Sequence, residues 1–123
     1  MLSTLVILAG FWLSHSVVEE HECRGAETTL EMTTCLERRV KEVERVLVVR
    51  IGEVSESSSG THKRLFEESQ SEWLRFRDVE CRAIREFYRE GTLSTVAYLK
   101  CKLSLTEERL NWIKGVYAGL SSP

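Results

Sequence analysis

Four cysteines are the residues whose type and spacing most restrict the chemistry of this chain. Cys23, Cys35, Cys81 and Cys101 are separated by 12, 46 and 20 residues. Structural zinc sites usually bring two ligands to within roughly two to four residues of each other, and thioredoxin-type redox centres use a CxxC motif. Neither spacing occurs here. The sequence therefore predicts no metal site and no redox centre, and favours two structural disulfides.

Side chains suited to catalysis are few. The histidines are His15, His21 and His62, and no phosphate-binding glycine loop, HExxH or GxSxG motif occurs. One stretch is rich in carboxylates, namely Glu67, Glu68, Glu72, Asp78 and Glu80. Arginines between them indicate a solvated, charge-balanced helix face rather than the carboxylate pair of a glycosidase. The sequence therefore predicts a protein that is not an enzyme and that has no cofactor.

The N-terminal segment predicts export. Residues 2–13 are mostly apolar, no Asp, Glu, Lys or Arg precedes Glu19, and Ser14 and Ser16 suit a cleavage site after Ser16. About a dozen apolar residues are fewer than the roughly 20 that a membrane-spanning helix needs. We expect a signal peptide at 1–16 and a periplasmic or secreted protein with no membrane contact after cleavage. An uncleaved anchor or a buried N-terminal helix is the alternative.

Length and charge limit the function of the remaining chain. Residues 17–123 are about 107 residues, which is enough for one domain and too few for two. The net charge is −2, so no basic field exists to attract phosphates, and nucleic acid is not expected as a partner. From Glu19 to Glu37 there are six acids and one base, which predicts an acidic surface near the start of the mature chain.

The first predicted helix begins at a capping box and carries a regular apolar stripe. Thr28 and Glu31 have the capping-box spacing. Apolar residues then recur at intervals of three and four, at Leu36, Val40, Val43, Leu47, Ile51 and Val54. The β-branched run at 46–51 would also suit a strand, but the stripe around it favours a helix.

Two more helices are predicted after a polar loop at 55–62. The second should run from Lys63 to about Glu90, with Gly91 in the glycine position after the helix end, and the third from about Thr92 to Gly119. The second helix is expected to bury Phe66, Trp73, Phe76, Ile84 and Phe87. Three helices with short connections predict an all-α, antiparallel three-helix bundle stapled by two disulfides.

Counting residues from the expected turns places three of the cysteines at a similar height in this bundle. Cys35 and Cys81 are equally far from a turn near Ser58, and Cys81 and Cys101 from a turn near Gly91. Cys23 precedes the first helix and can fold back. We expect Cys35 to pair with Cys101 and Cys23 with Cys81, and the close alternative pairs Cys35 with Cys81 and Cys23 with Cys101. Either pattern would tie all three helices together.

A set of residues stands in a distinctive order and spacing along the chain. These residues are Cys23, Thr29, Met32 and Cys35, then Trp73, Phe76, Arg77, Asp78 and Cys81, then Cys101, Thr106 and Arg109. In this order and spacing they resemble the LprI-like lysozyme inhibitors, a family of small secreted bacterial proteins, over roughly Glu22 to Ile113. The resemblance implies an all-helical exported domain whose named member binds and inhibits lysozyme. The chain departs from the family pattern at 46–49, where valine and leucine replace polar positions.

Packing explains most of these residues without a site. Trp73 and Phe76 lie on the apolar side of the second helix, and we expect them in the core. Arg77 and Asp78 are expected to form ion pairs or capping contacts, with Arg109 or Glu80 as partners.

Residues that packing leaves unexplained are the candidates for binding a protein partner. They are Ser57, Ser58, Ser59 and His62 in the loop, and Trp112 beside the apolar stripe of the third helix. A polar loop with nearby basic residues suits a cleft lined by carboxylates, and the acidic N-terminal segment suits a basic partner. We expect an inhibitor of a lysozyme or another peptidoglycan hydrolase. The alternative is an envelope interaction or stress module with a different partner, such as a second copy of itself.

Overall fold

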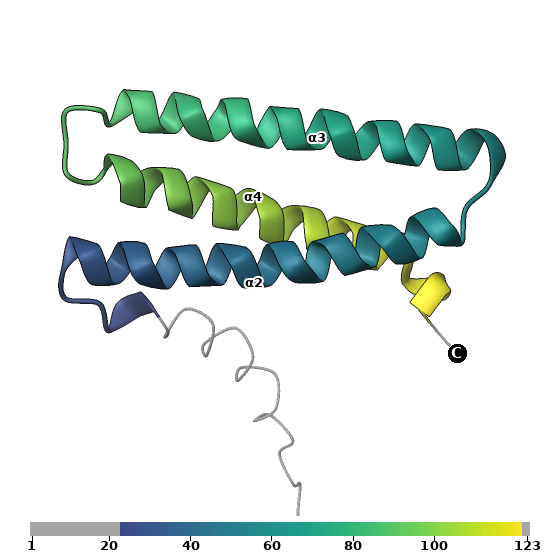
Figure 1. The fold of residues 1–123 in the computed structure, drawn as a ribbon, viewed down its shortest axis with the longest axis horizontal. Coiled ribbons are helices and arrows are strands. Elements are labelled where there is room, and N and C mark those ends of the chain that lie inside the picture. The colour runs from purple at the N-terminus through teal and green to yellow at the C-terminus, as the bar shows by residue number, and fades with distance from the viewer. Residues whose placement is uncertain (1–22, 122–123) are drawn as a thin grey trace, which may run out of the picture.

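The computed structural model describes residues 23–121 and contains three long α-helices. They are α2 (Thr29–Glu56), α3 (Gly60–Phe87) and α4 (Ser94–Val116), and a short 3₁₀ helix, η1 (Ala118–Ser121), follows them. No strand occurs within the described range, and residues 46–51 are helical. The predicted all-α, antiparallel three-helix bundle is confirmed (Figure 1). The expected signal peptide at 1–16 lies outside the described residues.

The start of α2 follows the capping-box prediction. The Thr28 hydroxyl accepts a hydrogen bond from the Glu31 backbone N–H at 3.1 Å, and the Glu31 carboxylate accepts one from the Thr28 backbone N–H at 3.3 Å. Five of the six predicted stripe residues are buried, and the sixth, Ile51, is half-buried. Because the stripe follows the helical period over the whole element, one face of α2 is available for packing.

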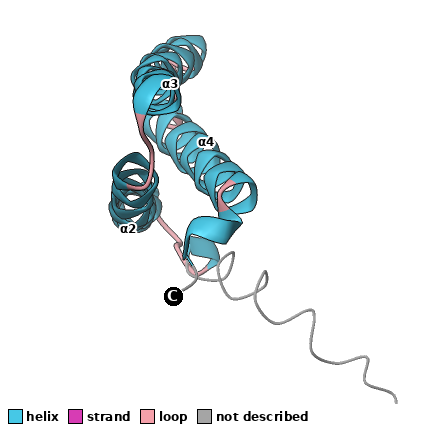
Figure 2. Ribbon diagram, turned by 90° about the vertical axis from the view of Figure 1, so that its right-hand side faces the viewer, coloured by secondary structure: helices cyan, strands magenta, loops and turns pink. Residues whose placement is uncertain are grey.

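Helix α4 lies between the other two helices. It contacts α2 and α3 along their lengths, whereas α2 and α3 contact each other only sparsely (Figures 1 and 2). The main core cluster contains Val43, Leu47, Val54, Phe66, Leu110 and Ile113. A smaller cluster of Leu36, Val96 and Leu99 lies nearer the α3–α4 turn, and Leu103 packs against both. Contact with α4 therefore supplies most of the apolar burial.

Helix α3 buries a narrower face than the sequence predicted. Phe66 is buried, and Trp73 and Ile84 are half-buried, but Phe76 is 52% exposed and Phe87 is 80% exposed. The prediction that these two phenylalanines lie in the core is wrong. The reason is that α3 has one main neighbour, so only the side chains directed at α4 are covered. Phe76 is three residues beyond Trp73 and is therefore rotated about 60° away from it.

Both turns differ from their predictions. The connection between α2 and α3 is Ser57–Ser59, so residues 55–56 and 60–62 of the expected loop are helical. Gly60 has a positive φ of 56°, which lets the chain reverse so tightly. Within the described residues no other glycine has a positive φ, so Gly91 does not cap α3 as predicted. Successive four-residue turns make that connection instead, closed by hydrogen bonds from the backbone N–H groups of Arg89, Gly91 and Ser94 to carbonyls three residues earlier.

The disulfides are Cys23–Cys35 and Cys81–Cys101, with Cα separations of 5.7 and 5.5 Å. The favoured pattern, Cys35 with Cys101 and Cys23 with Cys81, is wrong. The alternative pattern, Cys35 with Cys81 and Cys23 with Cys101, is wrong too. The shared height of Cys81 and Cys101 was predicted correctly, and these residues join α3 to α4. Cys35, however, is rotated about 100° from Leu36, whose side chain packs in the α2–α4 core, so Cys35 meets the returning N-terminal segment instead. The two bonds therefore do not tie all three helices together.

Candidate functional site

The three serines of the predicted binding loop form the turn at one end of the bundle. Ser57 is the C-cap residue of α2. Ser59 is the N-cap residue of α3, and its side chain makes no capping hydrogen bond. The Ser58 hydroxyl donates to the Val54 carbonyl at 2.6 Å. Ser57 and Ser59 are exposed. Two of the three serine hydroxyls are therefore presented to solvent at the tip of the molecule.

His62 lies on the first turn of α3 and connects it to the end of α4. Its Nε2 atom is 3.0 Å from the Tyr117 hydroxyl, and its ring stacks on Phe66 with centroids 6.2 Å apart. Phe66 and Tyr117 make an edge-to-face contact with centroids 5.4 Å apart. His62 is nevertheless exposed. It therefore closes the end of the core and keeps an accessible edge beside the serines.

An open hollow of about 600 Å³ lies between this turn and the end of α4. Its lining is Ser57, Ser58, Ser59, His62, Val116, Tyr117, Gly119 and Leu120. The four predicted loop residues thus share one concave surface with residues that are about 55 positions later in the chain. Sequence reasoning missed both apolar residues of this lining. Val116 lies off the apolar stripe of the third helix, and Leu120 follows the predicted end of that helix at Gly119.

Trp112 lies on α4 close to the same end of the bundle. It is 62% exposed, as the sequence suggested, and lines a second hollow of about 350 Å³ with Trp73, Glu108 and Arg109. Val116 is four residues after Trp112, so the two exposed side chains are neighbours on one helix face. Trp112 and Val116 therefore form an exposed apolar link between the two hollows. We refer to the two hollows and this link as the end surface.

Arg77, Thr106 and Arg109, three residues of the distinctive sequence order, have structural partners. Arg77 Nη1 donates to the Glu44 carboxylate and to the Thr106 hydroxyl, each at 3.0 Å. The Thr106 hydroxyl in turn donates to the Lys102 carbonyl at 2.6 Å. The guanidinium carbons of Arg77 and Arg109 lie 5.2 and 5.8 Å from the Trp73 ring centroid. These residues hold the helices together, a structural role that the sequence interpretation anticipated for Arg77.

The partners of the Arg77-Asp78 pair differ from those suggested by the sequence. Arg77 pairs with Glu44, and Asp78 pairs with Arg82 at 3.3 Å on the exposed side of α3. Neither Arg109 nor Glu80 is involved. The sequence could not place Glu44 opposite Arg77, because the two residues are 33 positions apart and on helices that scarcely meet.

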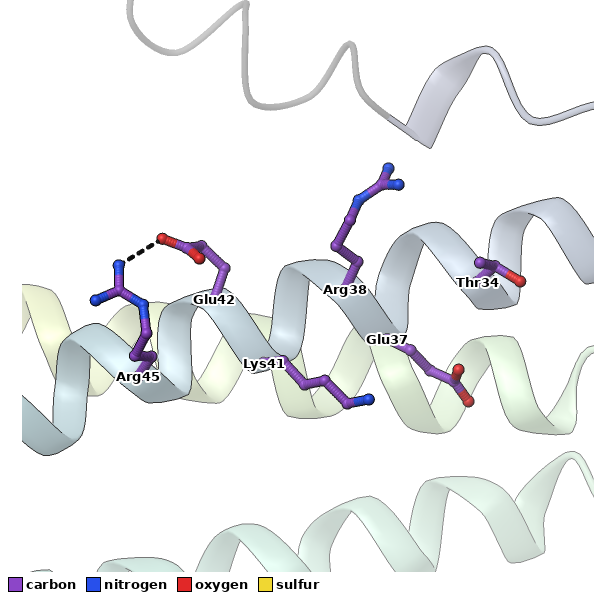
Figure 3. A pocket seen from close by; sticks show the side chains of 6 residues that line it. All are labelled: Thr34, Glu37, Arg38, Lys41, Glu42 and Arg45. Atoms are coloured by element: carbon purple, nitrogen blue, oxygen red, sulfur yellow. Dashed lines mark hydrogen bonds and ion pairs between the residues drawn. The ribbon is translucent and has the colours of Figure 1, made fainter.

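The outer face of α2 carries another hollow, of about 440 Å³, lined entirely by polar residues (Figure 3). They are Thr34, Glu37, Arg38, Lys41, Glu42 and Arg45. Figure 3 shows the Glu42 and Arg45 side chains directed at each other, and their hydrogen bond is 2.9 Å long. This bond and the positive charge of Arg45 lower the pKa of the Glu42 carboxyl. Mixed charges of this kind characterise a solvated helix face.

Residues 23–121 contain no cluster of His, Cys, Asp and Glu that could hold a metal ion. Over the same range, the helices lack a segment both long and apolar enough to cross a membrane. What the end surface does offer is two hydroxyls, an imidazole and an exposed indole around concave surfaces. This composition suits recognition of another molecule.

A comparison with models of known protein families gives a match over most of the chain. The family model described as "Lysozyme inhibitor LprI" matches residues 21–113. The matched range contains both disulfides, α2, α3 and most of α4. Neither the curated proteins nor the solved structures give a match.

Proposed function

The chain belongs to the LprI lysozyme inhibitor family, and from this membership we propose that it is exported and inhibits a lysozyme or another peptidoglycan hydrolase. The family match carries the proposal, since it spans residues 21–113 of a 123-residue chain. Export is supported by the two disulfides, which persist in oxidising compartments. In this proposal residues 1–16 are a signal peptide and residues 17–123 form the single mature domain.

The end surface is the region that we assign to the target. Helix α2 alone is about 42 Å long, so the Ser57–Ser59 turn lies at the narrow tip of an elongated molecule. Glycoside hydrolases hold two carboxylates in a substrate cleft. The exposed hydroxyls of Ser57 and Ser59 can donate hydrogen bonds to such carboxylates. Lys63 and Arg64 follow on the first turns of α3, and their positive charge would favour approach to an acidic cleft.

A cell-wall lysis assay tests the proposed function. The protein, purified with both disulfides formed, is incubated with chicken-type, goose-type and invertebrate-type lysozymes. We expect at least one of them to lose activity when the inhibitor is in micromolar excess. Full activity of all three enzymes at that excess would contradict the proposal.

Variants of the tip test the assigned surface. Replacing both Ser57 and Ser59 with Ala is expected to weaken inhibition about tenfold, because two charge-assisted hydrogen bonds are removed. The matched control replaces Ser71 and Ser104, which are exposed serines away from the turn, and should leave inhibition unchanged. Equal inhibition by both double variants would place the inhibitory contact elsewhere.

A second candidate function is an envelope interaction module without inhibitory activity. The observation that favours it is the exposed apolar face of α3, formed by Phe76, Val79, Ala83 and Phe87 at helical spacing. Such a face can bind another protein or a second copy of this one. Size-exclusion chromatography with light scattering tests the second-copy form, since a monomer at all concentrations would exclude it.

A further inference from the structure

Arg109 differs from Arg39 and Arg77, two other arginines that reach between helices. Arg77 pairs with Glu44 at 3.0 Å, and Arg39 pairs with Glu107 at 3.4 Å. Arg109 donates only to neutral oxygens, from Nε to the Gln70 side chain at 3.3 Å and from Nη2 to the Ser69 hydroxyl at 3.4 Å. Within residues 23–121 it forms no ion pair with a carboxylate. In the described part of the fold, no carboxylate therefore lies within ion-pair distance of its guanidinium.

Partial burial makes this arrangement costly for Arg109. Desolvation lowers the pKa of its guanidinium, yet an arginine remains charged in proteins. A charge removed from water is unfavourable unless an opposite charge or several hydrogen bonds compensate it. The two neutral acceptors and the face of Trp73 compensate part of that cost. A carboxylate arriving from outside would compensate more of it.

The surroundings of Arg109 leave room for such a carboxylate. Arg109 lines the hollow of about 350 Å³ between α3 and α4, together with Trp73, Glu108 and Trp112. Trp112 is mostly exposed and is not explained by packing. Exposed tryptophan and partly buried arginine are the residue types that dominate binding energy at protein interfaces.

We propose that this hollow binds an Asp or Glu side chain presented by the target hydrolase, with Arg109 as the anchor for its carboxylate and Trp112 covering its apolar part. This inference rests on the proposed function. The contact would be a salt bridge shielded by an indole, and guanidinium–carboxylate pairs of this type are short and directional. The carboxylate of Glu108, which also lines the hollow, would repel an acidic side chain that does not reach Arg109.

A protein occupant is favoured by continuity with the rest of the end surface. Trp112 is followed one turn later by exposed Val116, which lines the hollow beside the serine turn. An aromatic and arginine centre, an apolar link and a polar serine rim together have the composition of a protein interface. A site for a free sugar would not need the apolar link and the serine-lined hollow that continue from it.

Preorganisation strengthens the site. The Arg109 side chain is fixed by Ser69, Gln70 and Trp73 from α3, so little rotamer freedom remains to be lost on binding. The four residues are brought together by the antiparallel packing of α3 on α4, which the Cys81–Cys101 disulfide fixes further along the same pair of helices.

Inhibition measurements test the anchor residues. With a lysozyme that the wild-type protein inhibits, Arg109→Gln and Trp112→Ala should each raise the inhibition constant at least tenfold. Arg75→Gln is the matched control for the loss of one positive charge, because Arg75 is exposed on α3, and it should inhibit as the wild type does. Wild-type inhibition by both anchor variants would overturn the inference and leave the proposed function intact. Circular dichroism confirms that each variant is folded.

A titration that does not depend on inhibition tests the hollow itself. The probes are acetyl-Leu-Asp-amide and acetyl-Leu-Asn-amide, and the signal is the NMR shift of the Trp112 indole N–H. We expect a saturable shift with the Asp peptide that is absent with the Asn peptide and absent in Arg109→Gln. No shift, or equal shifts with both peptides, overturns the inference. A shift produced instead by an N-acetylglucosamine tetramer also overturns it, by identifying a neutral sugar as the ligand.

Discussion

The guanidinium of Arg77 lies 3.0 Å from the carboxylate of Glu44 and bridges α3 and α2, two helices that otherwise have little contact. The same nitrogen also donates to Thr106 on α4. One side chain therefore connects all three helices near the middle of the bundle. The Arg77 side chain is only 12% exposed, so its contacts are partly shielded from water.

Replacing Arg77 with Met should lower the free energy of unfolding by about 2 kcal/mol, since hydrogen bonds to a shielded charge are lost while the packing of the side-chain stem is kept. Glu44→Gln should cost less, because the Glu44 side chain is 35% exposed. Urea unfolding followed by circular dichroism measures both. Arg82→Met is the control, since Arg82 forms an exposed ion pair with Asp78, and it should cost under about 1 kcal/mol. Equal stability of the Arg77 and Arg82 variants would contradict the bridging role.

Phe66 and Phe76 offer a matched comparison on one helix. Phe66 is buried in the main core cluster, whereas Phe76 is 52% exposed. Phe66→Ala should therefore destabilise the protein by about 4 kcal/mol, and Phe76→Ala by under about 1 kcal/mol. Thermal and urea unfolding of the two variants measure the difference. A loss of several kcal/mol in Phe76→Ala would mean that the open face of α3 is covered.

The fold was predictable where a local pattern determined the outcome. The α2 stripe and the Thr28–Glu31 capping box depend on residues three and four apart, and both are confirmed. The width of the buried face of α3 and the disulfide pairing depend on how the helices dock, and the predictions failed for Phe76, for Phe87 and for the pairing. Because α2 and α3 each pack on α4 rather than on each other, Phe76 is left exposed and Cys35 pairs with Cys23.

The candidate site was predictable to a similar extent. The serine turn and the exposure of Trp112 followed from local composition and helix phase. The proximity of both to one end of the bundle, and the position of Arg109 against Ser69 and Gln70, arise from packing between residues about 40 positions apart. No pattern within one helix carries that information.

The ion pair between Glu42 and Arg45 predicts that the pKa of the Glu42 carboxyl depends on Arg45. The hydrogen bond and charge of Arg45 lower the Glu42 pKa in the folded protein, so the stabilisation is present at neutral pH and is lost as the pH falls through that lowered pKa. In Arg45→Gln the Glu42 pKa should rise towards its ordinary value. Carbon-detected NMR titration of the Glu42 carboxyl measures this. Arg64→Gln, which removes a different surface cation, should leave the Glu42 titration unchanged, and an unaltered Glu42 pKa in Arg45→Gln would contradict the pairing.

Removal of the two disulfides should destabilise different parts of the protein, one the whole fold and the other a short segment. They close intervals of 12 and 20 residues, for which chain entropy gives about 3 kcal/mol each. Cys81–Cys101 joins two core helices, so replacing both residues with Ser should lower the global stability by about that amount. Cys23–Cys35 fixes a short segment before α2, so the corresponding Ser variant should increase amide hydrogen exchange mainly before Cys35.

Tryptic mapping of the unreduced protein checks the pairing on which this difference depends. Trypsin can cleave after Arg24, Arg38, Arg82 and Lys100, so the four cysteines fall in separate peptides. Mass spectrometry should find the Cys23 peptide linked to that of Cys35, and the Cys81 peptide linked to that of Cys101. A peptide linking Cys35 to Cys101 would contradict the observed connectivity. Equal global destabilisation by the two Ser variants would instead show that the segment before α2 is part of the cooperative core, because only then does its release unfold the helices.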